Sequence, residues 1–381
     1  MSASAIDELR AAFEEPFWEL GRDAARDRQT VLISWPSVPV ELVRAAGFLP
    51  VFARGRGTPT PAADRVLEPE LFPNRLRQLV EAALTHRLAD VAAIVVPRSS
   101  DPDYKCFLYL RELVRRGIAA KLPPILLFDL LQSDDSYARV YNADRAHALS
   151  ARLASLAGRQ HRAENVHNAI VSANRARDAA RHLQALRSGP PRIAGADALP
   201  LLGAFWHLEP ERYAALANAA ADMLVQRAPL ERQRVLVAGT PVDTPAIHGA
   251  IEAEGVAVVV AELSPFGGCG TSTDVELAND SLAALANHYS GESISARLPI
   301  NLLMHKLEDL LRVAQAVVLS QPQDDASFGW DYPRVRELLA RHSIPHTVLR
   351  GDPALGATKA DLERIRSLLG RTTTRLEVHC G

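Results

Sequence analysis

Residues 30–53 read TVLISWPSVPVELVRAAGFLPVFA, and this stretch decides the fold class. Residues 30–35 form a short apolar run that ends at a proline, which is typical of a buried strand. Residues 38–47 have a helical pattern, with a proline suited to the first turn and a glycine suited to the C-cap. Residues 49–53 are again short and apolar. Strand, helix and strand in this order predict a parallel sheet that is covered on both faces.

The same alternation continues along the chain on both sides of a helical region. Further strands are predicted at residues 91–96, 124–128, 234–240, 256–262, 316–320 and 346–349. Between these two sets, residues 137–230 are rich in Ala, Arg and Leu and contain no strand-like run, and a long helix is expected over residues 137–186 and another over 210–226. We therefore expect an α/β fold with two parallel-sheet domains and an intervening helical region. The expected boundaries are 1–28 for an N-terminal helix, 29–136 for the first α/β domain, 137–230 for the helical region and 231–381 for the second α/β domain.

Composition excludes several classes of protein. The 381 residues include 43 Lys and Arg against 45 Asp and Glu, so no broad basic field supports nucleic-acid binding. No apolar run reaches the roughly 18–20 residues that a membrane helix needs. The first residues carry acids and lack the order of a signal peptide, which favours a cytoplasmic protein. The three cysteines form no CxxC and no Cys/His cluster, so neither a zinc site nor a disulfide framework is expected.

The common nucleotide and hydrolase motifs are absent, so the site must be sought in the loops that follow strands. There is no GxGxxG, no GxxxxGK[ST] and no GxSxG. In open parallel sheets, ligands bind outside the carboxyl ends of the strands. Two such domains facing each other predict one interdomain cavity, bordered by Ser34, Ser100, Gly239, Gly268 and Asp324.

Four features, three in these loops and one at the end of a helical stretch, each have two interpretations. The run Gly267–Gly270 could present backbone N–H groups to an anion, or it could be a flexible loop. Cys269 within it is either a reactive thiol or an incidental cysteine without a basic neighbour. The pair Asp324 and Asp325 could bind a hard cation with waters, or cap the next helix. His288 is either a catalyst or a partner for a helix end.

Several segments together resemble the 2-hydroxyacyl-CoA dehydratase and benzoyl-CoA reductase family, in particular its 2-hydroxyglutaryl-CoA dehydratase D-components. The segments that carry the resemblance are PSVPVELVRAAGFLPV, ADVAAIVVPRSSDPDYKCFLYLREL, RQRVLVAGTPVDTPAIHGAIEAEGVAVVVAEL, SLAALANHYSG and AVVLSQPQDDASFGWDYPRVRELLARHSIPHTVLRGD. The resemblance implies two flavodoxin-like (Rossmann-like) domains and a helical part in each of two homologous subunits. It further implies a 4Fe–4S cluster held by three cysteines, an ATP-driven activator and a CoA thioester that is dehydrated through a ketyl radical or reduced at an aromatic ring.

The chain departs from that family at the positions of the cluster ligands. The first family cysteine corresponds to Ser100, in the pair Ser100–Asp101, and the third falls in the pair Asp324–Asp325. The second would lie in residues 291–297, which contain no cysteine. Because Fe–S clusters need thiolate ligands, we expect no cluster and no other cofactor in this chain, with a 4Fe–4S cluster in a partner subunit.

Three hypotheses of function follow. The first is a lyase or oxidoreductase subunit for an acyl-CoA, paired with a homologous cysteine-bearing subunit or with itself, and served by an ATP-dependent activator. The second is a redox-inactive CoA-thioester or small-ligand binding protein, or a scaffold. The third is an enzyme that uses Ser100, Asp101 and His288 as nucleophile, base or hydrogen-bond donor. The expected ligand cleft contains Ser34, Glu41 (from the family's Val-Pro-x-Glu-Leu motif), Gly239, Gly268, Cys269, Asp324 and Asp325.

Overall fold

The structure, a computed structural model, describes the backbone of residues 4–20, 29–133, 135–323, 325 and 327–379, with side chains as far as residue 371. Its first part consists of α1 (Ala5–Glu14), β1 (Thr30–Ile33), α2 (Val40–Ala45), β2 (Leu49–Phe52), α3 (Asn74–Leu84), β3 (Val91–Pro97), α4 (Asp101–Arg115) and β4 (Ile125–Phe128). The helical part consists of α5 (Ser136–Leu156), α6 (Ala163–Ser188), α7 (Gly195–Gly203) and α8 (Pro210–Leu224). The last part consists of β5 (Gln233–Gly239), α9 (Ala246–Glu252), β6 (Ala257–Glu262), α10 (Ser281–Glu292), α11 (Ile300–Leu311), β7 (Ala316–Ser320), α12 (Phe328–Arg341), β8 (His346–Leu349) and α13 (Lys359–His379).

The strands form two four-stranded sheets with the same topology. The first sheet has the order β2-β1-β3-β4 and the second has the order β6-β5-β7-β8. Every strand pair in both sheets is parallel. The central strands β1 and β7 are buried along their whole length, as their apolar sequences require. The α/β fold with two parallel sheets that was expected from the sequence is confirmed.

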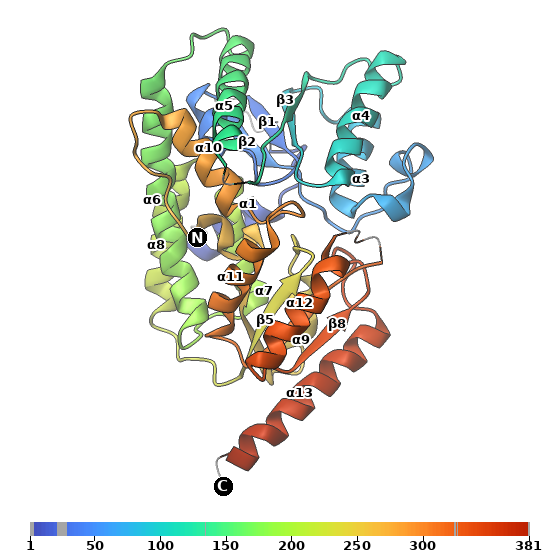
Figure 1. Ribbon diagram of the computed structural model, residues 1–381, viewed down its shortest axis with the longest axis vertical. Helices are drawn as coiled ribbons and strands as arrows, with labels where there is room; N and C mark the ends of the chain where they lie inside the picture. Colours follow the sequence, from blue (N-terminus) through green and yellow to red (C-terminus); the bar gives the residue numbers. More distant parts are fainter. Residues whose placement is uncertain (1–3, 21–28, 134, 324, 326, 380–381) are drawn as a thin grey trace.

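Long helices run along one side of both sheets (Figure 1). Helix α6 packs against α8, α2 and α7, and it also contacts β6 of the second sheet. Helix α10 follows β6 in the chain, yet it packs mainly against α5, which precedes the second sheet by many residues. Its Leu285 and Tyr289 are buried in the same core cluster as the first sheet's Val31. The second half of the chain therefore contributes a helix to the first half's core.

Two helix predictions were too long. The pattern over residues 1–28 predicted one N-terminal helix, but α1 ends at Glu14, since the nearby Pro16 has no N–H to continue the helix; residues 21–28 lie outside the described part. The long helix expected from residue 137 is divided into α5 and α6. The break includes Gly158, which has a φ of +62°, a conformation that glycine adopts without strain.

An aromatic cluster joins the two sheets. Phe266 of the second half lies 4.7 Å from Phe52 and 5.7 Å from Trp35, measured between ring centroids. The Trp35 indole also donates a 2.9 Å hydrogen bond to the Ile294 carbonyl across the same boundary. Burial of such rings is a large apolar contribution, so these contacts fix the relative position of the sheets. Over the described residues, no helix is long and apolar enough to cross a membrane.

Candidate functional site

A cavity of about 290 Å³ lies between the carboxyl ends of the two sheets. Loops that follow β1, β3, β5 and β7 all contribute to its lining, as the topology of parallel sheets requires. Further walls come from residues 294–297 and 352–354. The lining includes Trp35, Arg75, Ser99, Ser100, Asp101, Asp103, Gly239, Asp243, Ile294, Arg297, Leu303, Asp325, Phe328, Asp331 and Asp352.

The loop after β3 is held by hydrogen bonds to one buried carboxylate, that of Asp103. The hydroxyls of Ser99 and Ser100 donate to Asp103 Oδ2 over 2.8 and 2.6 Å. In return, the Asp103 backbone N–H donates to Ser100 Oγ over 3.2 Å, so Ser100 is the N-cap of α4. The Ser100 hydroxyl therefore already donates and accepts within the wall of the cavity.

Arg75 completes this wall. Its guanidinium forms two hydrogen bonds, of 2.8 and 3.0 Å, with the carboxylate of Asp103. It also donates to the Ser34 carbonyl over 2.8 Å and lies 4.6 Å above the Trp35 ring. A bidentate pair of this kind is strong and geometrically specific. Through Arg75, helix α3 fixes the loops that follow both β1 and β3.

The second half lines the cavity with carboxylates. Asp325 accepts hydrogen bonds from the Ser327 N–H and hydroxyl and from the Gly329 N–H, at 3.1–3.3 Å, and so caps the start of α12. Burial raises the pKa of Asp331 and the neighbouring Asp325 adds to this, against a lowering by Arg334. Burial also raises the pKa of Asp243, whose Oδ2 accepts from the Gly55 N–H over 3.0 Å.

Four of the expected site residues reach this cavity. Ser100, Asp101, Gly239 and Asp325 belong to its lining. Ser34 is buried, and it acts through its backbone carbonyl, which accepts from Arg75. Asp324 lies outside the described residues.

Gly268, Cys269 and His288 do not belong to the lining. Gly268 has a φ of +106° and lies against Gln184 of α6. Burial, together with the positive charge of Arg177, lowers the pKa of His288 to about 4. An imidazole in that environment stays neutral at physiological pH. Because His288 is not in the lining that contains Ser100 and Asp101, the cavity does not combine these three residues as one catalytic group.

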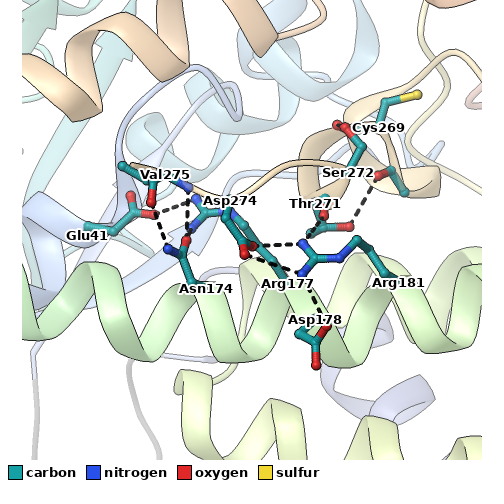
Figure 2. Close-up of polar contacts among 11 residues, drawn as sticks. Glu41, Asn174, Arg177, Asp178, Arg181, Cys269, Thr271, Ser272, Asp274 and Val275 are labelled. Atoms are coloured by element: carbon teal, nitrogen blue, oxygen red, sulfur yellow. Dashed lines mark hydrogen bonds and ion pairs between the residues drawn. The ribbon is translucent and has the colours of Figure 1, made fainter. Parts of the chain in front are cut away.

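Glu41 lies in a buried network instead of the cavity. Arg177 of α6 donates to Glu41 Oε1 over 2.5 Å, and both side chains are fully buried. The Tyr289 hydroxyl donates to the other carboxylate oxygen over 2.9 Å. Figure 2 shows Arg177 between Glu41 and Asn174. The Asn174 side-chain NH₂ donates to the Val275 carbonyl, and the Val275 N–H donates to the Asn174 side-chain oxygen. This network joins α2, α6 and α10, and its role is structural.

Arg181 lies one turn further along α6 and extends this attachment (Figure 2). It pairs with Asp178 of the same helix and with Asp274 of the loop that follows β6. These pairs are partly exposed, so each contributes little stability alone. Together with Asn174, they hold that loop on the surface of α6.

Sequence reasoning missed the residues that organise the cavity. Arg75 and Asp103 are 28 positions apart, and no periodic pattern connects them. Asp103 stands in the first turn of α4, where carboxylates are common, and this position is the one sequence feature that points to it. Arg297 and Asp331 were also missed, because neither residue stands in a sequence pattern that indicates a binding site.

The two described thiols lie outside the cavity lining. Cys106 is fully buried, and burial raises its pKa to about 12. Cys269 donates a 3.2 Å hydrogen bond to the Glu262 carbonyl, and burial raises its pKa to about 11. Cys380 is outside the described residues. A 4Fe–4S cluster needs converging thiolates, and the described residues of this lining supply none, so they do not fit that group.

A second hollow is larger and more open, at about 690 Å³. It is lined by residues such as Gly47, Arg159 and Glu209, at the far end of the first sheet, where β2 begins. Gln29 also belongs to its lining. None of the loops that follow β1, β3, β5 or β7 reaches it, so we place the candidate site in the smaller interdomain cavity.

Comparison with known proteins identifies the family. The family model of the 2-hydroxyglutaryl-CoA dehydratase D-component matches residues 37–377. Comparison with curated proteins gives no match. The matched range includes every described strand except β1 and every described residue of the cavity lining except Trp35. The family resemblance expected from the sequence is confirmed, and the chain belongs to the 2-hydroxyglutaryl-CoA dehydratase D-component family.

Proposed function

We propose that this chain is the acyl-CoA-binding component of a dehydratase of the 2-hydroxyacyl-CoA type or of a related aromatic acyl-CoA reductase. In this proposal the chain holds no 4Fe–4S cluster of its own and pairs with a homologous, cysteine-bearing subunit. That subunit holds the cluster, and an ATP-dependent activator supplies it with electrons. The proposal includes a cytoplasmic location.

One observation carries the proposal. The three segments that correspond to the family's cluster-ligand positions meet at one cavity: Ser100 after β3, Ser295 after α10 and Asp325 after β7. Family membership supports a ligand of the acyl-CoA class there. The side chains present are hydroxyls and a carboxylate, which bind and orient a ligand but are poor ligands for a low-potential cluster.

The roles of this chain's residues follow from the geometry. Trp35 and Phe328 present apolar surface to the acyl part of the ligand and exclude water from it. The Arg75–Asp103 pair keeps the loop after β3 in place. Arg297 is about one-third exposed and lies 3.9 Å from the exposed carboxylate of Asp101, so an anionic group that enters from solvent can replace Asp101 in this weak pair.

The second candidate is a redox-inactive acyl-CoA or small-ligand binding protein, or a scaffold. It is favoured by the same lack of thiols in the described lining, and it predicts ligand binding without turnover in any combination of subunits. The third hypothesis, polar catalysis by Ser100, Asp101 and His288, loses its geometric basis. The Ser100 hydroxyl is bonded to Asp103, and His288 does not belong to the cavity lining.

The test has two parts. The chain purified alone without air should contain less than about one iron per chain, whereas about four irons with matching sulfide would overturn the proposal. The chain should also bind acyl-CoA esters in titration calorimetry. Adding a cysteine-bearing homologous subunit and an activator ATPase should then give turnover of a 2-hydroxyacyl-CoA or an aromatic acyl-CoA. Binding without turnover in that full mixture would favour the second candidate.

A further inference from the structure

The charges around the interdomain cavity are strongly one-sided. Among the described residues of its lining there are six aspartates and two arginines, with no lysine, histidine or glutamate. Arg75 is committed to Asp103 by two hydrogen bonds. Arg297 lies beside Asp101, whose side chain is 82% exposed. Three other carboxylates of the lining, those of Asp325, Asp331 and Asp352, form no ion pair with a described arginine or lysine.

Among these carboxylates, that of Asp331 is partly buried and lies near a second carboxylate. Asp331 lies on α12, and no described residue donates a hydrogen bond to it. The charged groups that face it are Arg334, which is exposed on the same helix, and Asp325. Burial and the carboxylate of Asp325 both disfavour the charged form of Asp331 and raise its pKa. A second negative charge brought into this site by a ligand is therefore unfavourable.

A further part of the lining is apolar. Trp35, Ile294 and Phe328 are at most 6% exposed and lie in the lining together with Leu303. A surface of this kind binds hydrocarbon through the hydrophobic effect. An entering carboxylate would lose water and meet like charge, because both arginines of the described lining already lie against aspartates.

We propose that this cavity accepts the acyl chain of a CoA thioester only when that chain ends in an uncharged group. The substrate class is then an aliphatic or aromatic monocarboxylic acyl-CoA and not a dicarboxylic one such as a glutaryl-type chain. Asp331 is the specificity-determining residue. This inference rests on the proposed acyl-CoA binding and deepens it.

The experiment compares two ligands of equal chain length, pentanoyl-CoA and glutaryl-CoA, by titration calorimetry with the full chain. They differ at the far end of the acyl group, where one has a methyl group and the other a carboxylate. We expect pentanoyl-CoA to bind at least about tenfold more tightly, since like charges in a partly enclosed site repel. In the variant Asp331→Asn, the ratio of the two dissociation constants should fall by about threefold or more, with pentanoyl-CoA binding little changed.

Two further variants keep the test sharp. Asp331→Lys reverses the charge and should bring glutaryl-CoA to equal or tighter binding than pentanoyl-CoA. Asp144→Asn makes the same charge change on the exposed face of α5, outside the cavity lining, and should leave the ratio as in the unaltered chain. Circular dichroism confirms that each variant is folded.

The outcomes separate the two proposals. If both esters bind equally, or glutaryl-CoA binds more tightly, the specificity inference is wrong and acyl-CoA binding stands. If Asp331→Asn leaves the ratio unchanged, Asp331 does not determine specificity. If neither ester binds to the folded chain, the proposed function itself is overturned, and the specificity inference with it.

Discussion

The two halves of the chain have the same strand order but line the cavity in different ways. The first half presents a closed network, in which Arg75 neutralises Asp103 and both serine hydroxyls are used. The second half presents Asp325 and Asp331, and neither has an ion pair with a described arginine or lysine at contact distance. The shared strand order therefore places the loops of the two sheets at equivalent positions. The side chains on those loops decide whether that side of the cavity is rigid or electrostatically selective.

The halves also differ in how they attach to α6. Arg177 bonds Glu41 of the first half, and Arg187, ten residues further along, bonds Glu262 of the second. The second site includes His248, whose Nε2 lies 2.6 Å from Glu262. All of these side chains are fully buried. Helix α6 is thus joined to both halves by charged pairs that water does not screen.

The largest effect is expected from Glu41→Gln, which breaks the first of these attachments. The change leaves the guanidinium of Arg177 buried without its carboxylate, and we expect a loss of about 3–5 kcal/mol in the free energy of unfolding. Urea unfolding followed by circular dichroism measures it. The double variant Glu41→Leu with Arg177→Met removes both charges and should restore most of the loss. A loss below about 1 kcal/mol in the single variant would contradict a structural role for the pair.

The next effect concerns the rigid wall of the first half. Arg75→Ala leaves the buried Asp103 carboxylate with fewer donors, and we expect a loss of about 2–3 kcal/mol. Arg77→Ala is a matched control on the same helix, because Arg77 pairs with the more exposed Asp64 and its loss should cost at most about 1 kcal/mol. Thermal unfolding of both variants side by side gives the comparison. Equal losses would show that the Arg75 network has no special role.

A smaller effect is expected in the second half from Asp325→Ala. This change removes the acceptor for the N–H groups of Ser327 and Gly329 at the start of α12, which should cost about 1 kcal/mol. Asp325→Asn keeps a side-chain oxygen at the cap and should cost only a few tenths of that amount. Chemical unfolding of the two variants distinguishes capping from charge. A larger loss for Asn than for Ala would contradict the capping role.

The smallest effect concerns Asp243, where the two halves meet. Because burial raises its folded-state pKa above the ordinary 3.8, the folded chain binds this proton more tightly than the unfolded chain. The contribution of Asp243 to the free energy of unfolding therefore stabilises the folded chain at low pH. This stabilisation is lost as the pH rises from 3.8 through the raised pKa of the folded chain. Asp243→Asn should lack this loss, so the stability of the variant relative to the unaltered chain should increase with pH. At pH 4 the two should agree within about 0.5 kcal/mol.

The check is the free energy of unfolding measured from pH 4 to pH 8 for both proteins. Only the difference between the two curves is used, because it isolates Asp243 from the other titrating groups. A difference that decreases as the pH rises would mean that the charged carboxylate is favoured at this boundary. In that case, Arg54 and the Gly55 N–H would outweigh the effect of burial.

The positions of the elements could be predicted from the sequence because their signals are local. Strands β1 and β7 are apolar runs that a parallel sheet buries on both faces, and Gly47 adopts a φ of +93° directly after α2, where a helix end was expected. The loops after strands were also identifiable, since parallel strands place their carboxyl ends at one edge. Ser100, Gly239 and Asp325 follow three of these strands, and the structure places all three in the lining of one cavity.

What the tertiary structure decided is how distant side chains combine. Glu41 stands next to a loop that reaches the site, yet it pairs with Arg177, 136 positions away, and leaves the cavity. Gly268 also follows a strand, but its loop folds onto α6. Helix α10 crosses into the first half's core. The sequence by itself determined the family, through the segments that carry the resemblance, and the positions of the strands, since hydrophobic periodicity is read from neighbours along the chain. The pairing of charges and the selectivity of the cavity depend on which surfaces the folded chain brings together, and no local pattern encodes that.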